Sequence, residues 1–440
     1  MPIPEKEANM FRTTLGRTAV LTLGVTLALT ACGRSTETPA ADTSNDLTVL
    51  SDGPATGDIT VWAMGTEAEQ LPALAEAFEA ANPDADVTIT AVPWDDAPTK
   101  ISTAIASGQT PDATLLNPSA LASFAATGGF STVPEGVIDV AEFDANSIAA
   151  TEVDGEAYAV PLYVDTRTLF YRKDFAAAAG VEAPTSWAQW ADFARGLQTG
   201  GAAEGMLLPT GELGFTEQVL IPFLWGAGGS ILNEAGTEFT LDTPEVVAGL
   251  TQYQSFFDAG VASRTGTYEP WGSVEQRLAA GEIGSAINGP WLVPALKELL
   301  GAEYEQKIGV VTLPAGPVSG ASWLDGGQLA VFRDAENPEG AWKFIQYLSE
   351  AEPAAEFSRL TGDLPAVTAA WQPAGLNDDP TTAVFSEQVK DTGLTPAIAS
   401  WNEAAAIFAG YGEQLARGAV TPEDAASGLQ SELTGIGIGG

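Results

Sequence analysis

The chain has 440 residues, of which 18 are Lys or Arg and 58 are Asp or Glu, so its formal charge at pH 7 is −40. This length predicts two domains with cores of their own, and an apolar fraction of 45% predicts a folded protein. The acidic excess argues against a nucleic-acid partner, the lack of histidine excludes His-based catalysis and His-ligated metal sites, and a single cysteine excludes disulfides within the chain.

The first part of the chain has the pattern of a secretory signal. Arg12 and Arg17 precede an apolar stretch over 18–30, which is too short to span a bilayer and is followed by small residues. The acidic residues before Met10 do not fit a signal, so Met10 is an alternative to Met1 as the start. We therefore predict an exported protein.

The sole cysteine lies directly after this apolar stretch, in Leu29-Thr30-Ala31-Cys32-Gly33. The segment resembles the lipobox of bacterial lipoproteins, which implies a lipoprotein signal peptide over 1–31 and lipidation of Cys32. A plain signal peptide with a coincidental cysteine is the alternative. Residues 32–57, rich in Ser, Thr, Ala, Asp and Pro, predict a flexible tether to the extracytoplasmic face of the bacterial cell membrane.

From residue 58 onward, strand and helix patterns alternate along the chain. Thr66 and Glu69 form a capping-box pattern at the start of the first helix. The β-α-β-α-β order that opens this part predicts a mostly parallel sheet with helices on both faces. The predicted strands are Ile59–Ala63, Val87–Val92, Ala113–Leu116 and Ile283–Asn288. The predicted helices include Leu121–Ala126, Trp187–Leu197, Val246–Phe257, Ala341–Glu350, Glu403–Ala416 and Pro422–Leu433.

Segments spread over residues 58–435 match one protein family in their order and spacing. A strand-to-helix turn ends in a tryptophan at Ala286-Ile287-Asn288-Gly289-Pro290-Trp291, and Pro161–Asp165 is followed by Leu169–Asp174. Further matches are 108–112, 310–314, 337–344 and 418–425. Together these segments resemble the carbohydrate-binding extracellular proteins of bacterial ABC importers, the maltose-binding-protein-like family.

The resemblance implies an α/β, two-lobed periplasmic-binding-protein-like fold that closes over a ligand held in a cleft between the lobes. Three hinge crossings are expected near 163–168, 324–329 and 392–398. The N-lobe would then comprise 58–164 and 328–392, and the C-lobe 165–327 and 393–440.

A sugar site needs aromatic platforms for the C–H faces and carboxylate or amide groups for the hydroxyls. The family turn carries Trp291, and the first crossing carries an acidic sugar-binding residue at the position of Asp165. Other candidates follow predicted strands or lie near the crossings, and any one of these tryptophans could equally be a core residue. These candidates are Trp323, Asp325, Gly326, Trp225, Glu67, Asn117, Trp94, Trp62 and Trp401.

The first lobe departs from the maltose-binding pattern, since Leu116 and Ser119 stand where that pattern has a tryptophan and an aspartate. We therefore expect a neutral di- or oligosaccharide rather than maltose itself. The resemblance implies a monomeric receptor that delivers sugar to ABC permease subunits, with no catalytic residue, metal or cofactor. Two alternatives stay open: a binding protein for another neutral or cationic solute such as a polyamine or peptide, and a secreted glycoside hydrolase that uses paired carboxylates.

Overall fold

In the computed structural model of the chain, the described residues are 47–143, 145–265, 273–376 and 378–439. The predictions for the signal peptide over 1–31 and for lipidation of Cys32 lie outside these residues, as does most of the tether predicted over 32–57. None of the helices in the described ranges combines the length and the apolar character needed to cross a membrane.

The larger sheet is mixed, whereas the sequence predicts a mostly parallel one. Its strands are β11 (Leu364–Pro365), β6 (Val160–Thr166), β10 (Ser322–Val331), β3 (Ala113–Leu116), β1 (Gly57–Ala63) and β2 (Ala85–Ala91) in spatial order, with β12 (Thr392–Leu394) beside β10. Pairing is parallel between β1, β2 and β3 but antiparallel where β10 meets β3 and β6. β10 also pairs with β12 in parallel, whereas β11 pairs with β6 in antiparallel fashion. The prediction of parallel pairing therefore holds for β1 with β2 and β3, which helical crossovers connect, and for β10 with β12, but not for the strands that join these two parts of the sheet.

A smaller sheet is antiparallel, with β7 (Thr168–Arg172) between β8 (Ser285–Asn288) and β9 (Ile308–Val311). Neighbouring residues of β7 point to different apolar cores, because Phe170 belongs to the core that includes β1 and β3 and Leu169 to the core around α7 (Thr216–Ala227). A short hairpin of β4 (Glu152–Val153) and β5 (Glu156–Ala157) stands apart from both sheets.

The first helix begins earlier than the capping-box pattern predicts. Gly65, at a φ of +59°, turns the chain into α1 (Gly65–Ala81) directly after β1. The N-cap residue is Met64, so Thr66 already lies inside the first turn. The remaining α-helices are α2 (Ala97–Ser107), α3 (Pro118–Ala126), α4 (Ala145–Ala149), α5 (Lys173–Ala179), α6 (Trp187–Gly200), α8 (Pro244–Asp258), α9 (Val274–Ala280), α10 (Leu292–Leu300), α11 (Tyr304–Lys307), α12 (Pro338–Leu348), α13 (Ala351–Thr361), α14 (Pro380–Gln388), α15 (Trp401–Arg417) and α16 (Pro422–Ile436). Short 3₁₀ turns lie at Val140–Glu142, Gly301–Glu303 and Thr368–Ala370.

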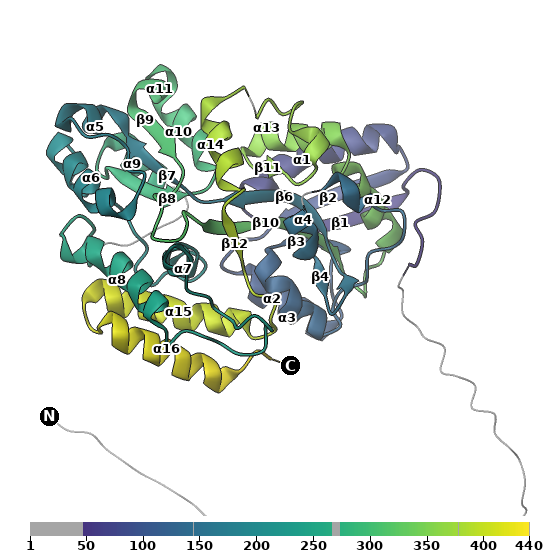
Figure 1. Cartoon of the computed structure of the whole chain (residues 1–440). Helices are drawn as coiled ribbons and strands as arrows, with labels where there is room; N and C mark the ends of the chain where they lie inside the picture. Colours follow the sequence, from purple (N-terminus) through teal and green to yellow (C-terminus); the bar gives the residue numbers. More distant parts are fainter. Residues whose placement is uncertain (1–46, 144, 266–272, 377, 440) are drawn as a thin grey trace, which may run out of the picture. The chain divides into compact units, whose positions relative to one another are not determined.

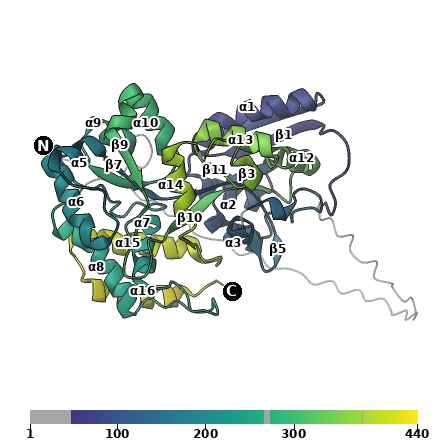
Figure 2. The same ribbon diagram turned by 45° about the horizontal axis from the view of Figure 1, so that its top comes forward.

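The helices form two groups, one around each sheet. Helices α1, α12 and α13 pack together on one side of the larger sheet, and α2 and α3 lie on its other side (Figures 1 and 2). Helices α7, α8, α15 and α16 pack on one another beside the smaller sheet, where α15 also contacts α3 of the other group. The contact between α3 and α15 brings the two groups together at one place.

Three segments far apart in the sequence pair side by side between these groups. Leu324 of β10 lies opposite Thr166 of β6 on one side and Leu394 of β12 on the other. From Thr166 the chain continues through Arg167 directly into β7 of the smaller sheet. The lobe boundaries expected from the sequence pass through these segments and stay predictions.

Candidate ligand-binding site

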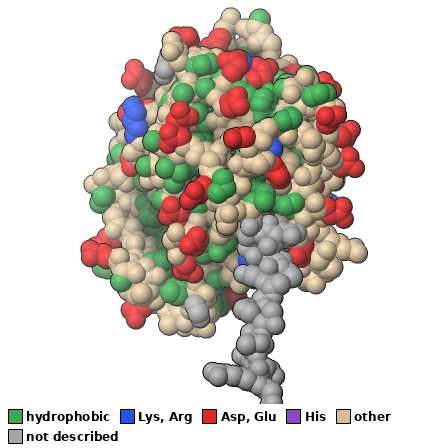
Figure 3. All heavy atoms as spheres, turned by 90° about the vertical axis from the view of Figure 1, so that its right-hand side faces the viewer, with side chains coloured by type: hydrophobic (Ala, Val, Ile, Leu, Met, Phe, Trp, Pro, Cys, Tyr) green, Lys and Arg blue, Asp and Glu red, His purple; other side chains and the backbone are tan. Residues whose placement is uncertain are grey.

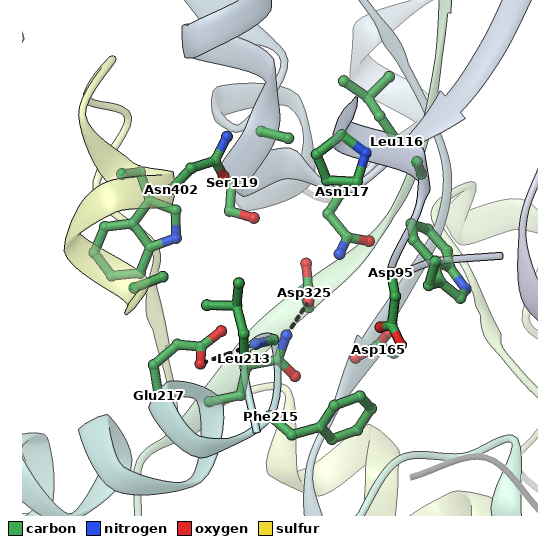
Figure 4. Close-up of a pocket in the computed structure, with 18 of the residues that line it drawn as sticks. Asp95, Leu116, Asn117, Ser119, Asp165, Leu213, Phe215, Glu217, Asp325 and Asn402 are labelled. Carbon is green, nitrogen blue, oxygen red and sulfur yellow. Dashed lines mark hydrogen bonds between the residues drawn. The ribbon is translucent and has the colours of Figure 1, made fainter. Parts of the chain in front are cut away.

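A cavity of about 800 Å³ lies next to these paired strands. This volume is within the range of pockets that hold small molecules. Its walls come from both groups of elements: Asn117 and Ser119 face it from α3 and the preceding residue, while Glu217 and Phe215 face it from the start of α7 (Figure 4). Asp165 and Asp325 also line it, from the neighbouring strands β6 and β10.

Asp165 and Asp325 are directly opposite each other in the antiparallel register of β6 and β10. Both residues are buried, and like charges placed opposite each other in a sheet repel. Arg167 offsets this repulsion, because its guanidinium donates to Asp165 Oδ1 and lies 3.7 Å from Asp325 Oδ2. One buried cation therefore holds two buried carboxylates together.

The side chain of Gln218 completes this group from α7. Its Oε1 accepts a hydrogen bond from Arg167 Nη2, and its Nε2 donates to Asp325 Oδ2 at 3.1 Å. Burial raises the pKa of Asp325 to about 7, to which the charge of Asp165 adds, while Arg167 lowers it. Gln218 thus ties α7 to Asp325 of β10 and to Arg167, which lies between β6 and β7.

A second buried acidic group lies on the side of α1. Glu67, in the first turn of α1, accepts a hydrogen bond from the hydroxyl of Tyr163 on β6. Burial, with a smaller contribution from the charge of Asp165, raises the pKa of Glu67 to about 7, while the hydrogen bond from Tyr163 opposes this rise. Asp363 directly precedes β11, whose Leu364 pairs with Val164, and burial raises its pKa well above the usual range.

Glu217 lies in the first turn of α7 and is 4% exposed. Its Oε2 accepts a hydrogen bond from the backbone N–H of Gly214 at 3.1 Å. Burial raises its pKa to about 8. The cavity wall therefore has carboxyl groups on the side of α7 as well as on the side of α1.

Aromatic side chains line the same cavity, namely Trp94, Phe124, Tyr163, Phe215, Trp291 and Trp401. The Trp291 ring lies under the Arg167 guanidinium at 4.7 Å from its carbon. Gly289 allows this position, because a Cβ there would be 2.1 Å from the Trp291 ring. Gly65 does the same for Trp94, whose Nε1 would be 2.6 Å from a Cβ on Gly65. Ring faces and carboxyl groups together are the two kinds of surface that a sugar requires.

Seven of the residues predicted from the sequence line the cavity, and four others do not belong to its lining within the described ranges. Those at the cavity are Glu67, Trp94, Asn117, Asp165, Trp291, Asp325 and Trp401. Away from it, Trp323 is 1% exposed and stacks on Trp225 at 5.7 Å between ring centroids, and Lys100 lies over the ring of Trp62. Gly326 lets β10 approach β6, since a Cβ there would be 2.3 Å from the carbonyl oxygen of Tyr163. The structure shows packing roles for these four, and ligand contacts stay predictions for all eleven.

Several polar residues of the cavity were not among the predicted ones, namely Tyr163, Arg167, Glu212, Glu217, Gln218, Asp363 and Asn402. Glu217 and Gln218 carried a signal in the sequence, because the first three residues of the helix Thr216–Ala227 are polar and the rest are apolar. Asp363 carried none, since it is one of 58 acidic residues and reaches the cavity through the pairing of β11 with β6.

Comparisons with known proteins agree with this architecture. A putative binding protein of Brucella abortus is 27% identical over 354 residues, which cover 79% of this chain and 85% of the relative. The maltooligosaccharide ABC transporter solute-binding lipoprotein of Streptococcus pneumoniae is 26% identical, over 84% of this chain and 85% of its own. The crystal structure of the GacH receptor of Streptomyces glaucescens, solved unliganded and with acarbose, superposes with a TM-score of 0.79 at 26% identity, over 86% of this chain and 97% of that one.

These similarities confirm the two-lobed α/β fold and the resemblance to sugar-binding proteins of ABC transporters. The relatives are binding proteins rather than enzymes, which confirms that prediction and overturns the glycoside-hydrolase alternative. The model of the family described as bacterial extracellular solute-binding protein matches residues 73–384. The chain therefore belongs to the bacterial extracellular solute-binding proteins.

Proposed function

We propose that this protein is the receptor of an ABC importer for a di- or oligosaccharide that carries no negative charge. The observation that carries the proposal is the cavity of about 800 Å³, whose walls combine tryptophan rings with buried carboxyl and amide groups. Within the described residues, Arg167 is the one basic side chain of its lining, and its guanidinium is committed to Asp165, which disfavours anionic ligands.

The importer recognises the receptor after the lobes have closed around the ligand. A ligand that contacts both walls, with Asn117 on one side and Glu217 on the other, binds the closed form more tightly and shifts the population toward it. The closed form then presents both lobes together to the permease subunits. The protein acts as a monomer in this scheme.

The protein acts at the extracytoplasmic face of the cell membrane, where a lipid on Cys32 anchors it. The support for the anchor is the Leu-Thr-Ala-Cys-Gly segment and the name of the pneumococcal relative, which is a lipoprotein. Replacing Cys32 with Ser should release the protein from the membrane into the medium, as measured by immunoblots of the two fractions. Ser35→Ala is the matched control and should stay in the membrane fraction, and retention of Cys32→Ser there would contradict the anchor.

A panel of neutral saccharides, followed by thermal unfolding, tests the ligand class. A ligand at about 100 times its dissociation constant stabilises the folded protein by about 2.7 kcal/mol, which raises the melting temperature by a few degrees. The panel should include α- and β-linked di- and oligosaccharides and, as a competing class, spermidine and short peptides. Stabilisation by saccharides supports the proposal, and stabilisation by spermidine or peptides alone would replace it with the cationic-solute alternative.

Substitutions of tryptophan then test whether the ligand binds in this cavity. Trp94→Ala and Trp291→Ala should each weaken saccharide binding about tenfold, because each loses a platform worth about 1.4 kcal/mol. Trp62→Ala is the matched control, since Trp62 is also half-buried but does not line the cavity. Calorimetric titration measures all three. Equal losses for Trp62→Ala and Trp94→Ala would show that the ligand lies elsewhere.

A further inference from the structure

The walls of the cavity carry many more acids than bases. Seven carboxyl side chains line it, and Arg167 is the one basic side chain in the lining that the structure describes. Two of the acids, Asp95 and Glu212, are more exposed to solvent. The other five, each 6% exposed or less, are Glu67, Asp165, Glu217, Asp325 and Asp363.

Two buried oxygens of these five acids have no hydrogen-bond partner among the described residues, namely Asp325 Oδ1 and Asp363 Oδ1. Of these two residues, Asp325 already lies 3.7 Å from the Arg167 guanidinium. Arg167 is committed to Asp165 and Asp325, the Tyr163 hydroxyl to Glu67, and a backbone N–H to Glu217. Asp363 is 2% exposed, and its Oδ1 has no hydrogen-bond partner among the described residues. A buried carboxyl oxygen without a donor is costly, so this oxygen indicates a donor that arrives from the cavity.

Asp363 lies close to the acids of the α1 side. Leu364, its neighbour, pairs with Val164, which is the neighbour of Asp165. The next pair joins Pro365 with Tyr163, whose hydroxyl reaches Glu67. Glu67, Asp165 and Asp363 therefore surround one end of the cavity from α1, β6 and the start of β11.

Five buried carboxyls facing a single guanidinium cannot all be ionised, because burial penalises each charge and the charges repel one another. Burial raises the pKa of Glu67, Asp165, Glu217, Asp325 and Asp363 accordingly. The raised pKa values of Glu67, Glu217 and Asp325 indicate that these groups bind protons close to neutral pH. A cation bound among these carboxyl groups would neutralise their negative charge in place of the protons.

We propose that the saccharide bound here carries a protonated amino group, which lies among Glu67, Asp165 and Asp363 and donates a hydrogen bond to Asp363 Oδ1. The inference rests on the proposed saccharide-binding function and departs from the neutral ligand expected from the sequence. The ammonium group enters with its charge, and a neighbouring carboxylic acid releases its proton to solvent and becomes the carboxylate that faces it. No bond between heavy atoms forms or breaks.

Matched pairs of sugars test this proposal, because the members of a pair differ in one amino or hydroxyl group. The pairs are the β-1,4-linked disaccharide of glucosamine against cellobiose, and 2-amino-2-deoxymaltose against maltose. In calorimetric titrations of the mature chain at pH 6.5, we expect the amino sugar of at least one pair to bind at least about tenfold more tightly than the neutral sugar of the same pair. Titrations in two buffers of different ionisation enthalpy should show the release of about one proton per amine bound.

The outcomes separate this inference from the proposed function. A neutral saccharide that binds more tightly than both amines overturns the inference and leaves the receptor function standing. Binding of spermidine with no binding of any saccharide overturns both.

Asp363→Asn keeps the shape of the side chain and removes its charge, so it should lose the preference for the amino sugar over its neutral partner. Asp86→Asn, an exposed position on β2, makes the same change in net charge away from the cavity and should keep the preference. Glu67→Gln is the second variant if Asp363→Asn does not fold, as judged by its unfolding midpoint. Retention of the full preference by a folded Asp363→Asn or Glu67→Gln contradicts the placement of the ammonium group.

Discussion

The ion group around Arg167 shows how single residues shape this cavity. Asp165 and Asp325 are opposite each other on neighbouring strands, and both are buried. Without a cation between them, their charges would oppose the pairing of β6 with β10. Arg167 supplies this cation at the point where the chain passes from β6 of the larger sheet to β7 of the smaller one.

Replacing Arg167 with Met should therefore destabilise the protein by about 3 kcal/mol at pH 8, since breaking a buried ion pair leaves uncompensated charge. The loss should be smaller at pH 5, because the raised pKa values of both carboxyls allow protons to replace the missing cation. Urea unfolding at the two pH values measures this. Arg195→Met is the matched control, because the ion pair of Arg195 with Asp192 is exposed and should contribute less than about 1 kcal/mol. A loss for Arg167→Met that is equal at pH 5 and pH 8 would contradict the charge argument.

The raised pKa values of the buried acids also predict how stability depends on pH. Burial raises the pKa of Glu217 to about 8, above its value in an unfolded chain. Between about pH 5 and pH 8 the folded protein therefore binds more protons than the unfolded chain, and the free energy of unfolding falls as the pH rises. We expect a decrease of a few kcal/mol over this range for the ligand-free protein, measured by urea unfolding.

Glu217→Gln should make this decrease shallower, because the glutamine has no proton to lose. Glu245→Gln is the control, since Glu245 also lies in the first turn of a helix but is exposed. It should leave the profile unchanged. A profile of Glu217→Gln that runs parallel to that of the parent would contradict the burial argument.

At this scale the sequence predicted part of the site. Asp165 and Trp291 could be predicted from the family motifs, and Asn117 from its position after a predicted strand. Asp363 could not be predicted, because its position depends on the pairing of β11 with β6, which no local pattern reports. Trp323 and Trp225 illustrate the converse, since a tryptophan near a predicted crossing looks the same in sequence whether it faces a cavity or a neighbouring ring.

The join between β1 and α1 is the element that positions the acidic end of the cavity. Gly65 has a φ of +59°, and a Cβ there would be 2.6 Å from Trp94 Nε1 and 2.7 Å from Glu67 Oε2. A glycine is therefore required both for the turn of the backbone and for the approach of two cavity residues.

Gly65→Ala should destabilise the protein by about 3 kcal/mol, from left-handed strain and from overlap with Trp94 and Glu67, and should weaken ligand binding. Gly180→Ala separates the two causes, because Gly180 has a φ of +68° with open space around its Cβ position. It should cost about 1 kcal/mol and leave binding unchanged. Chemical unfolding and saccharide titration measure the pair. Equal effects of the two substitutions would show that backbone strain alone accounts for Gly65.

Elements with a clear pattern were predicted closely, and those without one were missed. The strand at Ala113–Leu116 was predicted to the residue, because it is a short apolar run between turn signals. Helix α7 is buried on nearly all sides, so it lacks the alternation of apolar and polar residues that marks a surface helix, and Pro222 lies inside it. The mixed order of the larger sheet escaped prediction because β10 reaches it from the smaller sheet rather than through a helix.

The charge of the whole molecule acts on a larger scale than any of these contacts. Acidic side chains are spread over the face shown in Figure 3, with few basic ones between them. This distribution agrees with the formal charge of −40 and indicates mutual repulsion over the folded surface. The repulsion is relieved when the chain expands on unfolding, so it lowers the stability of the folded state.

Salt should therefore stabilise this protein more than an ordinary one. Raising sodium chloride from 0.1 M to 1 M shortens the screening length from about 10 Å to about 3 Å, which weakens repulsion between neighbouring surface carboxylates. At pH 7.5 we expect the melting temperature to rise by several degrees. The same step at pH 4.5, where a large share of the exposed carboxyls begins to bind protons, should produce a clearly smaller rise. Thermal unfolding followed by circular dichroism measures both. An equal rise at the two pH values would assign the effect to a general action of salt on apolar burial, because that action does not depend on whether the carboxyls are charged.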